Sequence, residues 1–166
     1  MGAGKILAII GAIVGILSVV LYYLLPELFS YWRFDGGAAL SVFLGGFGFA
    51  NGSFMGVPYD PEYADDIFLL LVSILIIAGS ALLLIGALVE NKPLGIIGGI
   101  VCLGGPILLI IALFLELGNF ADFAILLSPG DILLFGSMTG ADWGLWIGTY
   151  MAIGAGAVGI IGGATL

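Results

Sequence analysis

Few residues in this chain carry groups that do chemistry. The sequence has no histidine, three basic residues and eleven acidic residues, so the usual general base and the commonest metal ligand are missing. The densest acidic cluster is Asp60, Glu62, Asp65 and Asp66. Carboxylate oxygens suit Ca²⁺ or Mg²⁺, but the spacing lacks the EF-hand pattern, and Asp65 and Asp66 also suit a helix start. We interpret the cluster as a helix start and solvated rim, with a cation site as the weaker alternative.

The other reactive side chains are one thiol and a few hydroxyls. Cys102 is the only cysteine, so no disulfide forms within the chain and no cysteine-based metal site exists. A thiol in an apolar span is usually inert packing. We therefore predict a non-enzymatic protein with no cofactor. The hydroxyls leave one alternative, a pore between subunits, and its lining would be Ser73, Ser80, Thr149 and Tyr150.

The composition requires a membrane environment. The 166 residues are 62% hydrophobic and 8% charged, whereas soluble proteins carry about 25% charged residues. Lipid must therefore be the solvent for much of the chain. The net charge of −8 and the lack of a basic patch exclude a nucleic-acid-binding protein.

Four uncharged runs have the length of about 20 residues that a helix needs to cross a bilayer. The first is too long for a cleaved signal peptide and has no small-residue cleavage site after it. The sequence predicts an all-α integral membrane protein, a single four-helix domain over residues 1–166 with short β or irregular segments in two outer loops. The expected spans are about 5–25, 66–89, 93–116 and 143–166, and the outer loops are 26–65 and 117–142.

The basic residues near the span ends predict the orientation. Lys5 and Lys92 fall on one side and Arg33 on the other, which favours cytoplasmic termini in a multi-pass protein of the cell membrane. The acidic loops then lie outside. Asn51 begins an Asn-Gly-Ser glycosylation pattern in the first outer loop. The short turn at 90–93 makes the second and third spans antiparallel neighbours.

Glycine recurs at helical spacing in the spans. Small residues let helix backbones approach closely in lipid, where packing rather than burial from water drives association. We expect these faces to pack helices, and one of the two faces on the fourth span to remain for a neighbouring subunit; a compact bundle could instead use them all internally. The packing residues are Gly144, Gly148, Ala152, Gly156, Gly159 and Gly163 in the fourth span, with Gly11, Gly15, Gly95 and Gly99 in the first and third.

Proline and aromatic residues add local predictions. Pro106 predicts a kink in the third span, and a broken ion-binding helix is the less favoured reading. Phe43, Phe47 and Phe49 have the period of a strand. The segment 128–131 has the residues of a type II turn, between apolar triplets that suit a hairpin or a helical turn.

The layout resembles the claudin-like tetraspans, with four spans, both ends inside and a longer first outer loop. The resemblance implies one extracellular sheet built from both loops, and polymerisation within the membrane in some members. That family's first-loop Trp…Gly-Leu-Trp signature and its cysteine pair are absent here; Trp143-Gly144-Leu145-Trp146 stands at the start of the fourth span instead. No functional residue is therefore carried over.

Glycine-striped spans, aromatic outer loops and the lack of reactive groups indicate a structural or assembly role. We expect a homo-oligomer that associates through its glycine-rich helix faces and outer loops, with lipid as the remaining partner. The alternatives are a small oligomeric channel or transporter and an accessory subunit beside other membrane subunits.

Overall fold

Four long helices make up the body of the molecule. The computed structural model describes residues 2–37, 39–63, 66–118, 120–121 and 132–166. Each long helix has the length and apolarity to cross a membrane, which confirms the four predicted spans on those two criteria. The four helices are α1 (Ala3–Val20), α3 (Ile67–Leu88), α4 (Lys92–Phe114) and α6 (Ile147–Ala164). Within the described residues, short helices adjoin them, among them η1 (Leu21–Tyr23), α2 (Pro26–Phe29) and η2 (Gly46–Gly48).

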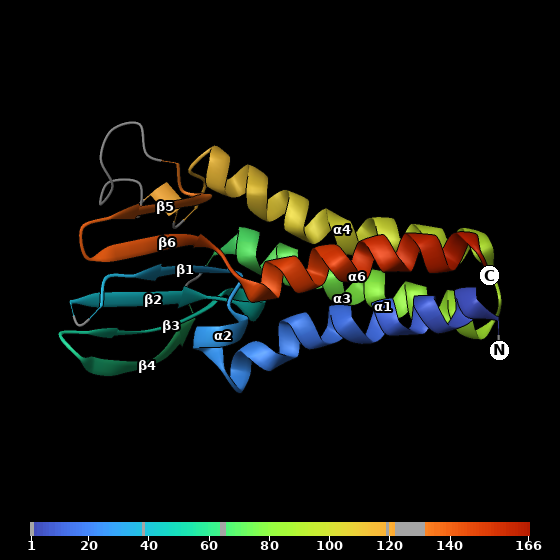
Figure 1. The fold of residues 1–166 in the computed structure, drawn as a ribbon, viewed down its shortest axis with the longest axis horizontal. Helices are drawn as coiled ribbons and strands as arrows, with labels where there is room; N and C mark the ends of the chain where they lie inside the picture. Colours follow the sequence, from blue (N-terminus) through green and yellow to red (C-terminus); the bar gives the residue numbers. More distant parts are fainter. Residues whose placement is uncertain (1, 38, 64–65, 119, 122–131) are drawn as a thin grey trace.

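The helices run side by side as a bundle, and the sheet stands at one end of it (Figure 1). Both termini lie at the other end, beside the turn between α3 and α4. Lys5 Nζ lies 3.0 Å from Glu90 Oε1, which ties the start of α1 to this turn. The side-chain oxygen of Asn91 accepts a hydrogen bond from the Leu94 N–H at 3.0 Å, so α4 begins with a side-chain cap.

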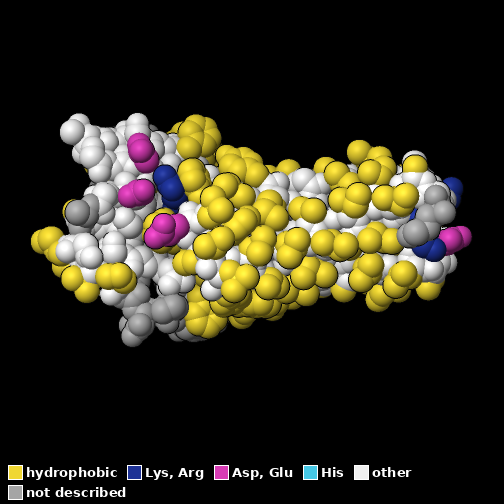
Figure 2. Space-filling view, turned by 60° about the horizontal axis from the view of Figure 1, so that its bottom comes forward, with side chains coloured by type: hydrophobic (Ala, Val, Ile, Leu, Met, Phe, Trp, Pro, Cys, Tyr) yellow, Lys and Arg dark blue, Asp and Glu magenta, His cyan; other side chains and the backbone are white. Residues whose placement is uncertain are grey.

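Large branched side chains cover the outer sides of the bundle helices, and the inner sides carry many small residues beside buried leucine, isoleucine and valine. Branched side chains such as Ile13, Ile74 and Ile100 are exposed, and on the face drawn in Figure 2 apolar side chains cover the bundle while charged groups lie near its two ends. Glycine and alanine face the interior. This is the arrangement expected where lipid solvates the outside and backbone contacts fill the inside.

The outer loops form one antiparallel sheet of six strands, in the order β4-β3-β2-β1-β6-β5. The pair of β1 and β6 joins the two loops, with Phe34 opposite Trp143. The first loop gives β1 (Trp32–Asp35), β2 (Leu40–Leu44), β3 (Phe49–Phe54) and β4 (Val57–Tyr63); the second gives β5 (Phe135–Met138) and β6 (Ala141–Leu145).

The prediction of an all-α protein with short β or irregular segments in the loops is correct for the helices and wrong for the extent of the β structure. The chain is predominantly helical but carries a continuous sheet, because strands from both loops satisfy one another's backbone groups. The expectation of a single sheet built from both loops is confirmed.

The fourth span begins later than predicted. Residues 143–145 belong to β6, and α6 starts at Ile147. Gly144 has φ +151° and a β-carbon there would meet the Leu134 carbonyl oxygen at 2.8 Å, so Gly144 serves the sheet and not a helix face. Asp142 likewise lies in β6. The apolar strand merges with the span in the sequence, which concealed the boundary.

One local prediction also needs correction. Phe47 does not continue a strand from Phe43 to Phe49, because it lies in η2 with φ +55°. Pro106 lies inside α4 (Lys92–Phe114), and the kink there stays a prediction. The turn predicted at 128–131 lies outside the described residues.

Candidate functional site

A serine in the bundle joins the sheet to the helices. Ser73 on α3 is fully buried, and its Oγ accepts a hydrogen bond from the Phe47 N–H at 2.7 Å. The same Oγ lies 3.2 Å from Tyr31 Oη and donates to the Leu69 carbonyl at 3.1 Å. Burial raises the pKa of the Tyr31 phenol, so this group stays a neutral donor. One hydroxyl therefore satisfies polar groups from three separate segments.

A tyrosine makes the second joint. Tyr22 in η1 is fully buried, and its Oη lies 2.7 Å from the Phe43 carbonyl oxygen and 2.9 Å from the Phe49 carbonyl oxygen. The Asn51 amide nitrogen donates to the same Oη at 3.2 Å. The end of the first span thus holds the loop between β2 and β3.

The start of α6 makes the third joint. Thr149 Oγ1 donates to the Tyr31 carbonyl at 2.8 Å, and the Trp146 N–H donates to the same carbonyl at 2.9 Å. The Gly148 N–H donates to the Ser30 carbonyl at 3.1 Å. Hydrogen bonds to buried groups are costly to break, so the sheet has a fixed position on the bundle.

One face of the sheet is covered by the chain itself. Trp32 Nε1 donates to the Leu133 carbonyl at 2.7 Å, and the Trp32 ring meets Phe120 edge to face at 5.9 Å between centroids. Phe34 and Trp143 stack with centroids 6.4 Å apart. All of these side chains are buried, so this face is a small aromatic core.

The opposite face is more polar and is open in part: Asp142, Ser137 and Phe135 on it are exposed, whereas Ser41 and Phe43 are buried. Directly opposed residues on neighbouring antiparallel strands share a face, and the register therefore places two rows of side chains across it. Asp35 and Asp142 stand opposite each other in the first row, where two like charges are unfavourable. The first row is Ser53, Ser41, Asp35, Asp142 and Ser137; the second is Asn51, Phe43, Arg33, Gly144 and Phe135.

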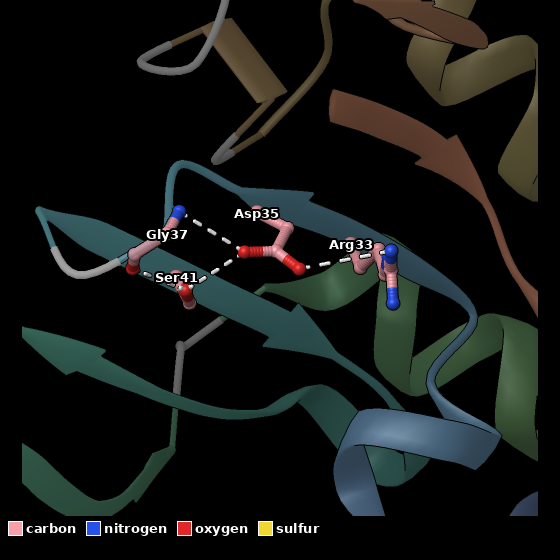
Figure 3. A network of polar contacts seen from close by, with 4 residues as sticks. All are labelled: Arg33, Asp35, Gly37 and Ser41. Atoms are coloured by element: carbon pink, nitrogen blue, oxygen red, sulfur yellow. Dashed lines mark hydrogen bonds and ion pairs between the residues drawn. The ribbon is translucent and has the colours of Figure 1, made fainter. Parts of the chain in front are cut away.

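Asp35 organises the turn between β1 and β2 (Figure 3). Its Oδ1 accepts hydrogen bonds from the Gly37 N–H at 3.1 Å and from Ser41 Oγ at 3.3 Å. Its Oδ2 lies 3.7 Å from the Arg33 guanidinium. Both carboxylate oxygens of Asp35 therefore have partners within β1, β2 and the turn between them.

Arg33 lies at the end of the open face that is nearer the bundle. Its guanidinium carbon lies 3.7 Å from the centroid of the Trp146 ring, within the range of a cation–π contact. The indole Nε1 of Trp146 is buried and has no hydrogen-bond partner among the described residues. Stacking thus holds Arg33 flat beside β6.

Two grooves hollow the open face. One of about 450 Å³ lies between α2 and strands β1 to β3, bordered by Glu27, Asp35 and Asn51. The other, of about 370 Å³, lies over β5 and β6, bordered by Phe135, Trp146 and Asp142. Gly144 lines the second groove together with Arg33 and Leu145.

No family model matches this chain, and no curated protein matches it.

The small residues predicted to pack helices lie between helices of this chain. A β-carbon on Gly99 would meet the Ile160 backbone nitrogen at 2.7 Å, and one on Gly11 would meet the Ala155 carbonyl oxygen at 2.8 Å. Both predicted faces of the fourth span are buried, so the expectation that one is left for a neighbour is wrong for the residues named. The buried set is Gly11, Gly15, Gly95, Gly99, Gly148, Ala152, Gly156, Gly159 and Gly163.

The acidic cluster divides between described and undescribed residues. Asp66 caps α3, since its Oδ1 accepts hydrogen bonds from the Phe68 N–H at 2.8 Å and the Leu69 N–H at 3.3 Å. Asp65 and the side chains of Asp60 and Glu62 lie outside the described residues. In the described part, no three metal-ligating side chains come together.

The predicted glycosylation acceptor lies in a strand and not in a loop. Asn51 is half-buried in β3, and its amide nitrogen, the atom that would carry a glycan, is bonded to Tyr22. Glycosylation of Asn51 stays a prediction, and a glycan there would replace one of the joints described above.

The hydroxyls of the pore alternative do not share a path. Ser73, Ser80 and Thr149 are buried inside the bundle, whereas Tyr150 is 58% exposed. Ser80 Oγ packs against Cys102 Sγ at 3.8 Å. These positions do not form one surface between subunits.

Sequence reasoning missed the open face of the sheet and used Arg33 only as a charge near a span end. The alternation of apolar Trp32 and Phe34 with charged Arg33 and Asp35 is the signal that could have found it, but a run of four residues is too short to be decisive.

Proposed function

We propose that this chain is a non-enzymatic integral membrane protein with an assembly role. The bundle holds the outer sheet in place, and the sheet serves as the platform on which neighbouring membrane subunits, copies of this chain included, dock. The observation that carries the proposal is the asymmetry of the sheet: one face is sealed by the chain's own aromatic residues, and the other is open and grooved.

The bundle supports the same role because its glycine faces are buried within the chain. Its interior combines buried aliphatic side chains with close backbone contacts, such as those of Gly99 and Gly156, and its outer surface is aliphatic. We therefore assign association to the sheet rather than to the glycine faces, which are occupied within the chain. The pore alternative loses support because the hydroxyls of Ser73, Ser80 and Thr149 are buried and bonded inside the bundle, whereas Tyr150 is exposed.

We further propose that the protein resides in the cell membrane with cytoplasmic termini and an external sheet. The grouping of Lys5, Glu90 and Lys92 at one end of the bundle is consistent with this orientation, since basic residues favour the cytoplasmic side.

The test is the composition of the particle extracted from native membrane. The protein, extracted in a mild polymer and measured by size exclusion with light scattering, should have a protein mass above that of one 17.1 kDa chain. Mass spectrometry then separates copies of this chain from other subunits. A single chain without companions, obtained at several extraction conditions, contradicts the assembly role. Ion conductance of the purified protein in a planar bilayer would favour the channel instead.

A further inference from the structure

The two edges of the sheet differ in their protection. β4 forms one edge and contains Pro58 and Pro61, and proline blunts an edge because it has no N–H to offer. β5 forms the other edge, and its sequence Phe-Gly-Ser-Met contains neither proline nor charge. Among the described strands, β5 is therefore the unprotected edge.

The register shows which backbone groups of β5 face outward. The Leu145 N–H donates to the Leu134 carbonyl at 2.9 Å, and Gly136 lies opposite Trp143. Bonded and non-bonded pairs alternate along an antiparallel ladder, so the N–H and C=O groups of Phe135 and Ser137 point away from β6. No described strand lies on that side.

The groove over β5 and β6 continues from this edge. Phe135 is 71% exposed and lines the groove together with Gly144 and Trp146. Side chains of an added strand would alternate between the two faces of the sheet. Every second side chain of such a strand would therefore stand on the open face, beside Phe135 and the groove.

The charges near the groove over β5 and β6 indicate what kind of strand could be added to this edge. Asp142 is exposed at the groove and has no ion pair among the described residues, whereas Arg33 is held by Asp35 and Trp146. A basic segment is attracted to this surface, and a second copy of the same acidic sheet is repelled.

We propose that the β5 edge binds an extended segment of a partner polypeptide as an additional strand, with a lysine or arginine facing Asp142 and an aliphatic side chain against Phe135. Backbone hydrogen bonds give such strand addition its affinity, and the pockets beside it give its specificity. The inference rests on the proposed assembly role and names the partner's chemistry.

The test uses the full chain in nanodiscs of uncharged phosphatidylcholine and a fluorescein-labelled alternating valine–lysine hexapeptide. Anisotropy should show saturable binding to the wild type and to Ser137→Ala. Ser137→Pro removes an outward N–H without breaking an internal bond, and it should weaken binding about tenfold, equivalent to about 1.4 kcal/mol. Asp142→Asn should weaken binding about threefold, and the matched valine–glutamate peptide should bind at least about tenfold more weakly.

A second measurement does not depend on a variant. The valine–lysine peptide N-methylated on the amides of one edge keeps its charge and should lose binding to the wild type. Equal affinity for Ser137→Pro and wild type, or for methylated and plain peptides, overturns the edge assignment. A peptide-independent dimer that disappears in Ser137→Pro overturns it in favour of a second copy. Failure of the peptide while a native complex persists refutes this inference alone; a lone chain in native membrane refutes the assembly role.

Discussion

The bundle and the sheet are stabilised in opposite ways. In the bundle, backbones meet where side chains are missing, as where Gly11 packs against Ala155. In the sheet and its joints, particular side chains supply the contacts, as Tyr22 does for the loop after β2. Substitutions that enlarge a side chain should therefore destabilise the bundle, and substitutions that remove a side-chain group should destabilise the sheet. The chain offers a separate probe for each region, since the three tryptophans lie at 32, 143 and 146 and the only thiol is Cys102 inside the bundle.

The largest effect is expected from Gly156→Leu. A β-carbon at this position would lie 2.5 Å from Leu103 Cγ and 3.0 Å from the Gly99 carbonyl oxygen, so the helices must separate. We expect a loss of at least about 3 kcal/mol of unfolding free energy, seen as faster alkylation of Cys102 in detergent. Gly154→Leu is the matched control, because a β-carbon there has nothing within 4 Å. Equal alkylation rates for the two variants would refute the packing of α6 described here.

Ser73→Ala should lower the stability of the sheet by removing a side-chain hydroxyl. The change leaves the Phe47 N–H and the Tyr31 hydroxyl without their buried acceptor, at a cost of about 2 kcal/mol. Thermal unfolding followed by tryptophan fluorescence should shift downward. Ser80→Ala removes a hydroxyl that meets only a thiol at 3.8 Å, and it should leave the fluorescence midpoint nearly unchanged. A larger shift for Ser80→Ala would show that the joint at Ser73 is not special.

Gly144→Ala sharpens the comparison, since it is a sheet position that should behave like the bundle. The residue has φ +151°, and an added β-carbon would meet Phe135 Cα at 2.9 Å. We expect a loss of about 1–2 kcal/mol, measured by the same fluorescence melt. Gly140→Ala, at φ +87° but with open space around it, separates backbone strain from crowding. If both variants lose equally, crowding at Gly144 is not the cause.

The smallest effect should come from Asp142→Asn. Asp142 stands opposite Asp35 on the open face, and removing one of two like charges should stabilise the sheet by about 0.5 kcal/mol. The gain should shrink at high salt, because salt screens exposed charges. A destabilisation that is independent of salt would mean that the carboxylate has a structural partner.

The two regions also differ in how far the sequence predicts them. Spans are predictable because lipid demands long uninterrupted apolar runs, and residues 67–88 and 92–114 stand out for that reason. The start of α6 could not be predicted, because the apolar strand at 143–145 has the composition of a continued helix. Small residues predicted close packing, but spacing alone does not name the neighbour. Asp142 stands next to a predicted span in the sequence, whereas its place in β6 depends on pairing with a strand about a hundred residues away.

The glycine-lined interior has a consequence for how the bundle assembles. Helices in a bilayer form before they associate, so the backbone freedom of each glycine is already lost when the spans meet. Burying a leucine also costs rotamer freedom, whereas burying a glycine costs none. Docking α1 against α6 at Gly11 and Ala155 therefore freezes almost no torsional motion, and modest dispersion forces are enough to hold the spans together.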